Sequence, residues 1–149
     1  MDRFETLIQM LRRRVPGLEL REQEPMSRHT SFRIGGPVRL MALPRSEEEA
    51  AQAVRAAAEL ELPPFFMGNG SNLLVADQGA EVFVVKTFDG LNRLETDGAG
   101  GVTAGSGVLL SRLANFALAN SLTGLEFAHG IPGSLGGAVT MNAGPTTGR

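Results

Sequence analysis

The residues from 130 to 144, GIPGSLGGAVTMNAG, constrain the fold of this chain more than any other segment. Five of these fifteen residues are glycine, and none carries a charged side chain. Glycine weakens helices and strands and proline removes a backbone donor, so the run cannot form one regular element throughout. Glycine also lets backbone N–H groups approach a planar ring or a pyrophosphate without a Cβ in the way. We therefore interpret the run as backbone that serves a ligand or a close chain contact.

A second glycine loop, GNGSNLL, lies upstream at residues 68–74. Either loop alone is also explained by a tight turn or by close backbone packing. A dinucleotide fingerprint would need a third glycine where Leu73 stands, and a phosphate-binding P-loop would need a lysine that the glycine loops lack. What remains is a cradle of backbone N–H groups, with Asn69, Ser71 and Asn72 as neutral donors, which suits a diphosphate held without a metal.

Composition describes an ordinary globular protein and excludes several classes of function. The chain has 149 residues, 42% of them hydrophobic and 20% charged, enough for one core or for two small cores that share an interface. A formal charge of -2 and a pI near 5.7 argue against a nucleic-acid partner. The absence of cysteine excludes disulfides, thiolate metal sites and a cysteine nucleophile.

The sequence shows no targeting segment and no catalytic constellation. The N-terminus lacks the apolar region of a signal peptide, and no stretch approaches the roughly 18 apolar residues of a membrane span, so we expect a cytoplasmic protein without a membrane partner. No Ser-His-Asp or metal-ligand set can be assembled from spacing, so we predict no catalytic residue and no metal ligand. The two histidines, His29 and His129, are interpreted as structural or exposed. Difficult chemistry would therefore come from a bound cofactor.

Hydrophobic periodicity predicts an α+β chain. The expected helices cover residues 2–15, 46–60 and 109–120, and the expected strands cover residues 38–43, 65–67, 82–85 and 102–104. Residues 91–101 are rich in Asp, Glu and Gly, which indicates a hairpin or a boundary between two small subdomains.

Three motifs share the order and spacing of a known family. They are HTSFRIGG at residues 29–36, GNGSNLL at 68–74 and GLEFAHGIPGSLGGAVTMNAG at 124–144. Together they resemble the UDP-N-acetylenolpyruvoylglucosamine reductase (MurB) family. The resemblance implies an α+β FAD-binding domain of the vanillyl-alcohol-oxidase (PCMH) type, with the flavin between two small α+β subdomains. It also implies a first subdomain at residues 1–90, an incomplete second subdomain at 91–149, and no substrate domain.

The resemblance assigns the two glycine loops to FAD. In the family the first loop grips the pyrophosphate, and the later run lies against the diphosphate and the isoalloxazine. The FAD-binding residues that this implies are Gly68, Asn69, Gly70, Ser71, Asn72, Leu73, Gly130, Ile131, Pro132, Gly133, Ser134, Gly136, Gly137, Ala138 and Asn142.

The activity implied is that of an NADPH-dependent flavoprotein oxidoreductase. In the family, hydride passes from NADPH to FAD and then to UDP-N-acetylglucosamine enolpyruvate, which gives UDP-N-acetylmuramate for peptidoglycan synthesis and so serves cell wall biogenesis, cell shape and cell division. A UDP-sugar and a nicotinamide nucleotide are the small-molecule partners that this implies.

The chain departs from the family pattern near its end. The residues PTTG at 145–148 replace the usual Ala-Tyr-Gly, and the family's arginine, proton-donating serine and glutamate belong beyond Arg149. We therefore expect these 149 residues alone to be inactive. Two alternatives remain open: a non-catalytic flavin-binding module or remnant, and another flavin oxidoreductase of the same fold.

Overall fold

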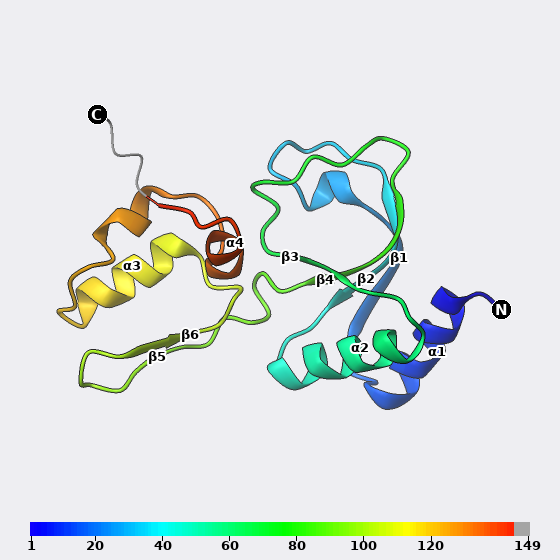
Figure 1. Cartoon of the computed structure of the whole chain (residues 1–149), viewed down its shortest axis with the longest axis horizontal. Coiled ribbons are helices and arrows are strands. Elements are labelled where there is room, and N and C mark those ends of the chain that lie inside the picture. Colours follow the sequence, from blue (N-terminus) through cyan, green and yellow to red (C-terminus); the bar gives the residue numbers. More distant parts are fainter. Residues whose placement is uncertain (145–149) are drawn as a thin grey trace.

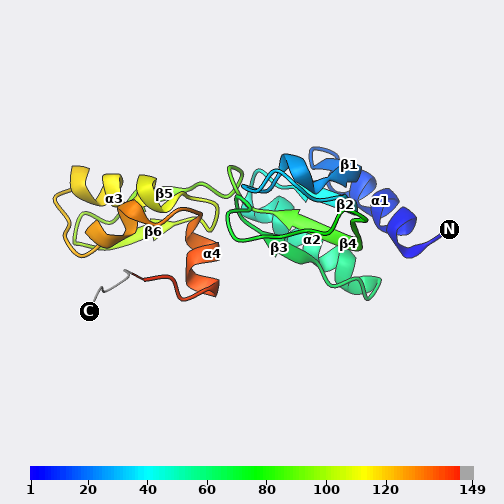
Figure 2. The ribbon, with the colours of Figure 1, turned by 90° about the horizontal axis from the view of Figure 1, so that it is seen from above.

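The computed structural model describes residues 1–144, which form two lobes side by side along the long axis of the molecule (Figures 1 and 2). The first lobe surrounds a four-stranded sheet and the second surrounds a two-stranded sheet. The predicted α+β class is confirmed. The boundary expected between residues 90 and 91 stays a prediction, and the departure at residues 145–148 lies outside the described residues.

The larger sheet has the strand order β1-β2-β4-β3. Its strands are β1 (Glu19–Pro25), β2 (Pro37–Leu43), β3 (Phe65–Met67) and β4 (Ala80–Lys86). β1 pairs antiparallel with β2, whereas β4 pairs parallel with both β2 and β3. Because β4 is parallel to β3, the chain that leaves β3 must run back along the sheet before it enters β4. Residues 68–79, which include the first glycine loop, make this return.

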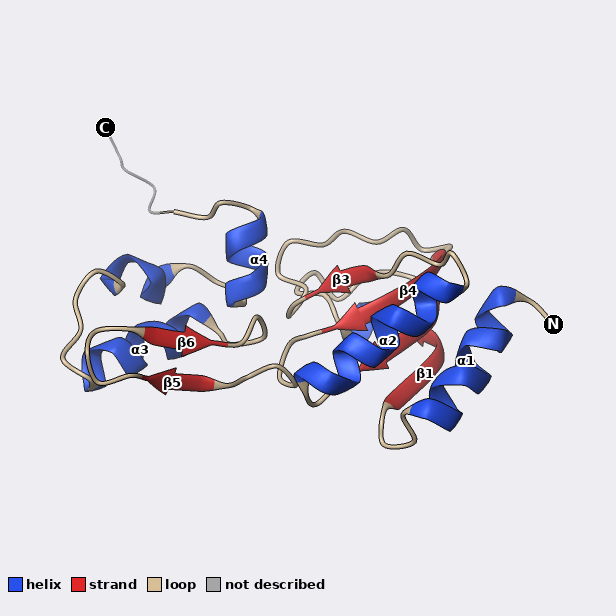
Figure 3. Ribbon diagram, turned by 60° about the horizontal axis from the view of Figure 1, so that its bottom comes forward, coloured by secondary structure: helices blue, strands red, loops and turns tan. Residues whose placement is uncertain are grey.

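Two helices, α1 (Arg3–Arg14) and α2 (Glu47–Glu59), cover one face of the large sheet (Figure 3). Leu11 of α1 and Ala56 of α2 are fully buried in one core with Leu40 and Phe83 of the sheet. The cap predicted for α2 is present, since the hydroxyl of Ser46 accepts a hydrogen bond from the N–H of Glu49. These contacts confirm the first two predicted helices.

The opposite face of the large sheet is covered by loops. Met26, Met41, Met67 and Val84 form its core, and Leu73 and Val75 of the return loop pack against them. The residues before β2 lie beside this loop: the N–H of Ser31 donates to the carbonyl of Gly70 at 3.1 Å, and Gly36 donates to Ala76 at 2.9 Å. The motif at residues 29–36 therefore supports the first glycine loop from behind.

The second lobe begins with the hairpin of β5 (Leu94–Thr96) and β6 (Val102–Ala104) and continues through α3 (Leu110–Ala119), the 3-10 turn η2 (Glu126–Gly130) and α4 (Leu135–Thr140). Leu113 and Ala114 of α3 share a core with Val108 and Ala128. α4 is attached to the turn after β6, because Leu135 donates to the carbonyl of Val108 at 2.7 Å and Gly136 donates to that of Ser106 at 2.8 Å.

Two elements differ from the sequence prediction. β1 was not predicted, because its sequence ELREQEP lacks apolar alternation and its one buried residue is Glu24. The glycine-rich run does not form one regular element throughout, as predicted, but it contains the short helix α4 despite Gly136 and Gly137. Tertiary contacts to Ser106 and Val108 offset the low helix propensity there. Among the described residues, no helix is long and apolar enough to cross a membrane.

We predict that Ala56→Leu lowers the free energy of unfolding by about 1–3 kcal/mol, because the added methylenes have no space between α2 and the sheet. Urea unfolding followed by circular dichroism measures the effect. Ala58→Leu is the matched control: Ala58 is exposed on the same helix, so its substitution changes stability by less than about 0.5 kcal/mol. Equal effects of the two substitutions would contradict this account of the core.

Candidate functional site

A cleft of about 810 Å³ has walls from both lobes. One wall is the first glycine loop, and the other comes from α4 and the residues before it. Thirteen of the fifteen residues predicted to bind FAD line this cleft: Gly68, Asn69, Gly70, Ser71, Asn72, Leu73, Ile131, Pro132, Gly133, Ser134, Gly136, Gly137 and Ala138. Motifs about 60 residues apart thus meet at one place, although whether they bind a cofactor stays a prediction.

Gly130 and Asn142 do not line this cleft. Gly130 faces a neighbouring cavity of about 390 Å³, which it shares with Asn69 and His129. Asn142 is exposed just beyond α4 with a φ of +49°, and its N–H donates to the carbonyl of Val139 at 3.2 Å. That left-handed conformation is one that asparagine tolerates well, so its position also fits an ordinary turn residue.

The first glycine loop lines the cleft and carries a row of backbone donors without a partner among the described residues. None of the N–H groups of residues 68–72 donates a hydrogen bond within the part of the chain that the structure describes. Gly70 has a φ of +75°, a conformation that costs glycine little and other residues more. Successive backbone N–H groups in such a turn form an anion-binding concavity.

The cleft combines neutral donors with apolar surface. Its polar side chains are Asn69, Ser71, Asn72, Thr87, Ser106, Ser134 and Thr140, and no charged side chain is among its described lining residues. Phe65, Phe66 and Met141 also line it and are 46%, 56% and 61% exposed. Such a site can hold a ligand that has both an anionic group and a flat apolar ring.

Packing explains several glycines without any ligand. A Cβ at Gly68 would overlap the hydroxyl oxygen of Ser134, and one at Gly70 would overlap the carbonyl oxygen of His29. A Cβ at Gly136 would lie 2.8 Å from that of Ser106. At Gly137, in contrast, a Cβ would meet only the Ser134 hydroxyl, at 3.6 Å. Gly137 is therefore a cleft residue whose missing side chain is not explained by packing among the described residues.

Sequence reasoning missed several residues of the cleft. Phe65 and Phe66 could have been found, because their apolar run leads directly into the first glycine loop, and Ser106 lies between two glycines. Thr87 carries no such signal. It reaches the cleft because β4 lies beside β3, where the N–H of Thr87 donates to the carbonyl of Met67 at 2.9 Å.

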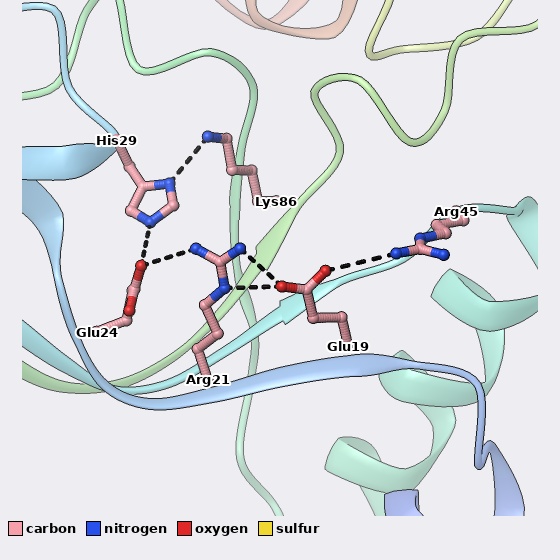
Figure 4. Close-up of polar contacts among 6 residues, drawn as sticks. All are labelled: Glu19, Arg21, Glu24, His29, Arg45 and Lys86. Carbon is pink, nitrogen blue, oxygen red and sulfur yellow. Dashed lines mark hydrogen bonds and ion pairs between the residues drawn. The ribbon is translucent and has the colours of Figure 1, made fainter.

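Polar side chains form a cluster around the buried residues Glu24 and His29 (Figure 4). His29 is 7% exposed, and its Nε2 lies 2.7 Å from the Oε1 of Glu24 while its Nδ1 lies 2.9 Å from the Nζ of Lys86. Arg21 donates to the same oxygen of Glu24 at 3.0 Å. The ring of His29 thus contacts charged side chains of the protein on both of its nitrogens. The described residues contain no group of three or more His, Cys, Asp or Glu side chains that could hold a metal ion.

Comparison with known proteins places these features in a family. The model of the FAD binding domain family matches residues 38–149. UDP-N-acetylenolpyruvoylglucosamine reductase from Alkaliphilus metalliredigens is 48% identical over 122 residues, 82% of this chain and 40% of that protein. The enzyme of the same name from Clostridium tetani is 44% identical over 148 residues, 99% of this chain and 48% of that protein. The chain therefore spans less than half the length of these relatives.

Solved structures agree with the sequence comparisons. The reductase from Thermus caldophilus aligns with a TM-score of 0.66 and 32% identity, covering 88% of this chain and 45% of that one. A cholesterol oxidase from Brevibacterium sterolicum aligns with a TM-score of 0.64 at 19% identity over 87% of this chain and 25% of that one, which shows a shared fold. The chain therefore belongs to the FAD binding domain family, with the fold that its motifs implied, and corresponds to the FAD-binding portion of UDP-N-acetylenolpyruvoylglucosamine reductases.

Proposed function

We propose that this chain binds FAD in the cleft, with the diphosphate on the N–H groups of residues 68–72. The observation that carries the proposal is this row of donors, which have no acceptor among the described residues. A cradle of N–H groups stabilises the negative charge of a diphosphate without a lysine or a metal ion. The cavity of about 810 Å³ is of the size that holds a cofactor, and Phe65, Ile131 and Met141 supply apolar surface for its rings.

The residues of the chain would bind and orient the cofactor. FAD, when bound, supplies hydride-transfer chemistry. The polar groups of the first glycine loop would bind the phosphates of FAD. α4 and the residues before it would form the opposite wall of the site. The fifteen residues predicted from the motifs, Gly130 and Asn142 included, remain the proposed FAD-binding set. The division into subdomains at residues 1–90 and 91–149 remains part of the proposal.

For the whole protein we propose the reaction of its relatives: reduction of UDP-N-acetylglucosamine enolpyruvate to UDP-N-acetylmuramate with NADPH, in the cytoplasm, for peptidoglycan synthesis. The names of relatives at 44% and 48% identity support this substrate class. The UDP-sugar and the nicotinamide nucleotide would then be its partners. A different flavin oxidoreductase is the alternative, because the cholesterol oxidase shares the fold.

We predict that Gly137→Ala weakens FAD binding without weakening the fold. Alanine in place of a helix glycine raises or preserves stability, by up to about 1 kcal/mol, while its methyl group reduces the space in the cleft. The expected loss of FAD affinity is about tenfold, measured by titration of FAD fluorescence. Val139→Ala, on an exposed position of α4 outside the cleft lining, should leave affinity unchanged. Wild-type affinity in a folded Gly137→Ala variant would contradict the proposed site.

We predict that Gly70→Ala lowers both stability and FAD affinity. The new Cβ would overlap the carbonyl oxygen of His29 and favour a different φ, at a cost of about 1–3 kcal/mol. Gly100→Ala is the matched control: Gly100 has a φ of +100° and open space around it, so its substitution tests backbone strain alone and should not change FAD affinity. Urea unfolding measures the stability of both variants, and FAD titration measures their affinity. Equal losses of FAD affinity in Gly70→Ala and Gly100→Ala would contradict a special role for Gly70.

We predict that these 149 residues do not reduce the enolpyruvyl UDP-sugar even when loaded with FAD and supplied with NADPH. Protonation of the substrate needs a positioned acid. The arginine, proton-donating serine and glutamate that the family resemblance implies for this step match no residue of this chain. Steady oxidation of NADPH that depends on the UDP-sugar would overturn this expectation.

A further inference from the structure

The contacts of His29 determine which of its ring nitrogens carries the proton. A lysine ammonium has donors and no acceptor, so the 2.9 Å contact from Lys86 requires a lone pair on Nδ1. The hydrogen must then be on Nε2, from which it is donated to the carboxylate of Glu24 at 2.7 Å. With Lys86 charged, the ring is therefore neutral and links the cation Lys86 to the anion Glu24.

Both His29 and the segment of Lys86 are held against the first glycine loop. The carbonyl oxygen of His29 lies so close to the Cα of Gly70 that no Cβ fits between them, and two residues later Ser31 donates to the carbonyl of Gly70 at 3.1 Å. Lys86 is followed by Thr87. Both the N–H and the hydroxyl of Thr87 donate hydrogen bonds to the carbonyl of Met67, at 2.9 Å and 3.2 Å, and Met67 is the last residue before the loop.

We propose that His29 is a positioning residue for the diphosphate of FAD, because it holds the first glycine loop in its binding shape only while its ring is neutral. This inference rests on the proposed binding of FAD in the cleft. His29 itself does not line the cleft and would act through Gly70.

Protonation would break the link between Lys86 and Glu24 at one defined contact. The imidazolium has no lone pair, so Nδ1–H would face the ammonium of Lys86 and a hydrogen bond would become a repulsion. The charged groups around the ring are Glu24 and Arg21 from β1, Lys86 at the end of β4, and Asp89 close to Lys86. Glu24 would still accept a hydrogen bond from Nε2. The contact that is lost is therefore the one between Nδ1 and Lys86, the residue that precedes Thr87.

The surroundings favour the neutral ring near neutral pH. Burial lowers the pKa of His29, the hydrogen bond to Glu24 acts against this, and the charge of Lys86 lowers it further, which leaves the pKa below its ordinary value. Burial acts to raise the pKa of Glu24, but hydrogen bonds from His29 and Arg21 outweigh it, so this carboxylate stays charged. Because the pKa of His29 is lowered by folding, the stability it contributes is present above about pH 6.5 and is lost as the pH falls toward the folded-state pKa.

The test compares FAD affinity at about pH 7.5 and about pH 5.5 in the wild type and in His29→Gln, by FAD fluorescence titration of the full chain. Glutamine retains one acceptor and one donor but does not titrate. The diphosphate of FAD is esterified on both sides and takes up no proton in this range. Because the pKa of His29 lies below its ordinary value, protonation of this one ring limits the loss at about pH 5.5 to less than about tenfold. We expect a loss of about threefold or more in the wild type on acidification and no loss beyond the error of the titration in His29→Gln. His129→Gln, at the other histidine, should keep the wild-type loss.

The outcomes separate this inference from the proposed function. An equal loss in His29→Gln and wild type overturns the role of His29 and leaves FAD binding intact, whereas no FAD binding at about pH 7.5 overturns the proposed function and this inference with it. Urea unfolding at both pH values shows whether each titration reports on folded chain. If His29→Gln does not fold, the ring is titrated in the wild type by NMR: bound FAD should lower the pKa of His29, and an unchanged pKa overturns the proposal.

Discussion

The parallel pairing of β4 between β2 and β3 is the constraint on which the rest of the structure depends. It brings the carboxyl ends of β3 and β4 to one edge of the sheet, where the first glycine loop begins and Thr87 enters the cleft. It also requires a long return over the sheet, which residues 68–79 provide. The chain leaves β4 at this edge and passes directly into the second lobe, so both walls of the cleft follow from one strand order.

Glycine has two separate uses around the cleft. At Gly68, Gly70 and Gly136 the protein itself occupies the space that a side chain would need, so these residues allow the loops to approach one another and the residues behind them. At Gly137 the space is open, and the missing side chain leaves room in the cleft. The sequence left two explanations open, close backbone packing and approach of a ligand. Packing holds at these three positions, whereas approach of a ligand remains the proposal for Gly137.

Much of the fold could be predicted from local pattern, and the failures have physical reasons. The apolar spacing of Leu7 and Leu11 and the cap at Ser46 indicated α1 and α2 correctly, because these signals lie within one helix. β1 carried no such signal, since its pairing with β2 forms the strand and its buried residue is the charged Glu24. α4 could not be expected from its glycines, because carbonyl acceptors at Ser106 and Val108 hold its first turn.

The sequence by itself determined the identity of the glycine loops, their neutral donors and the family to which their order and spacing point. Only the tertiary structure decided what the first motif does: His29 and its neighbours lie behind the loop instead of in the cleft. It also brought together Glu24, His29 and Lys86, the last two of which are 57 residues apart in the chain. Such contacts depend on which strands are neighbours, and local periodicity carries no information about strand order.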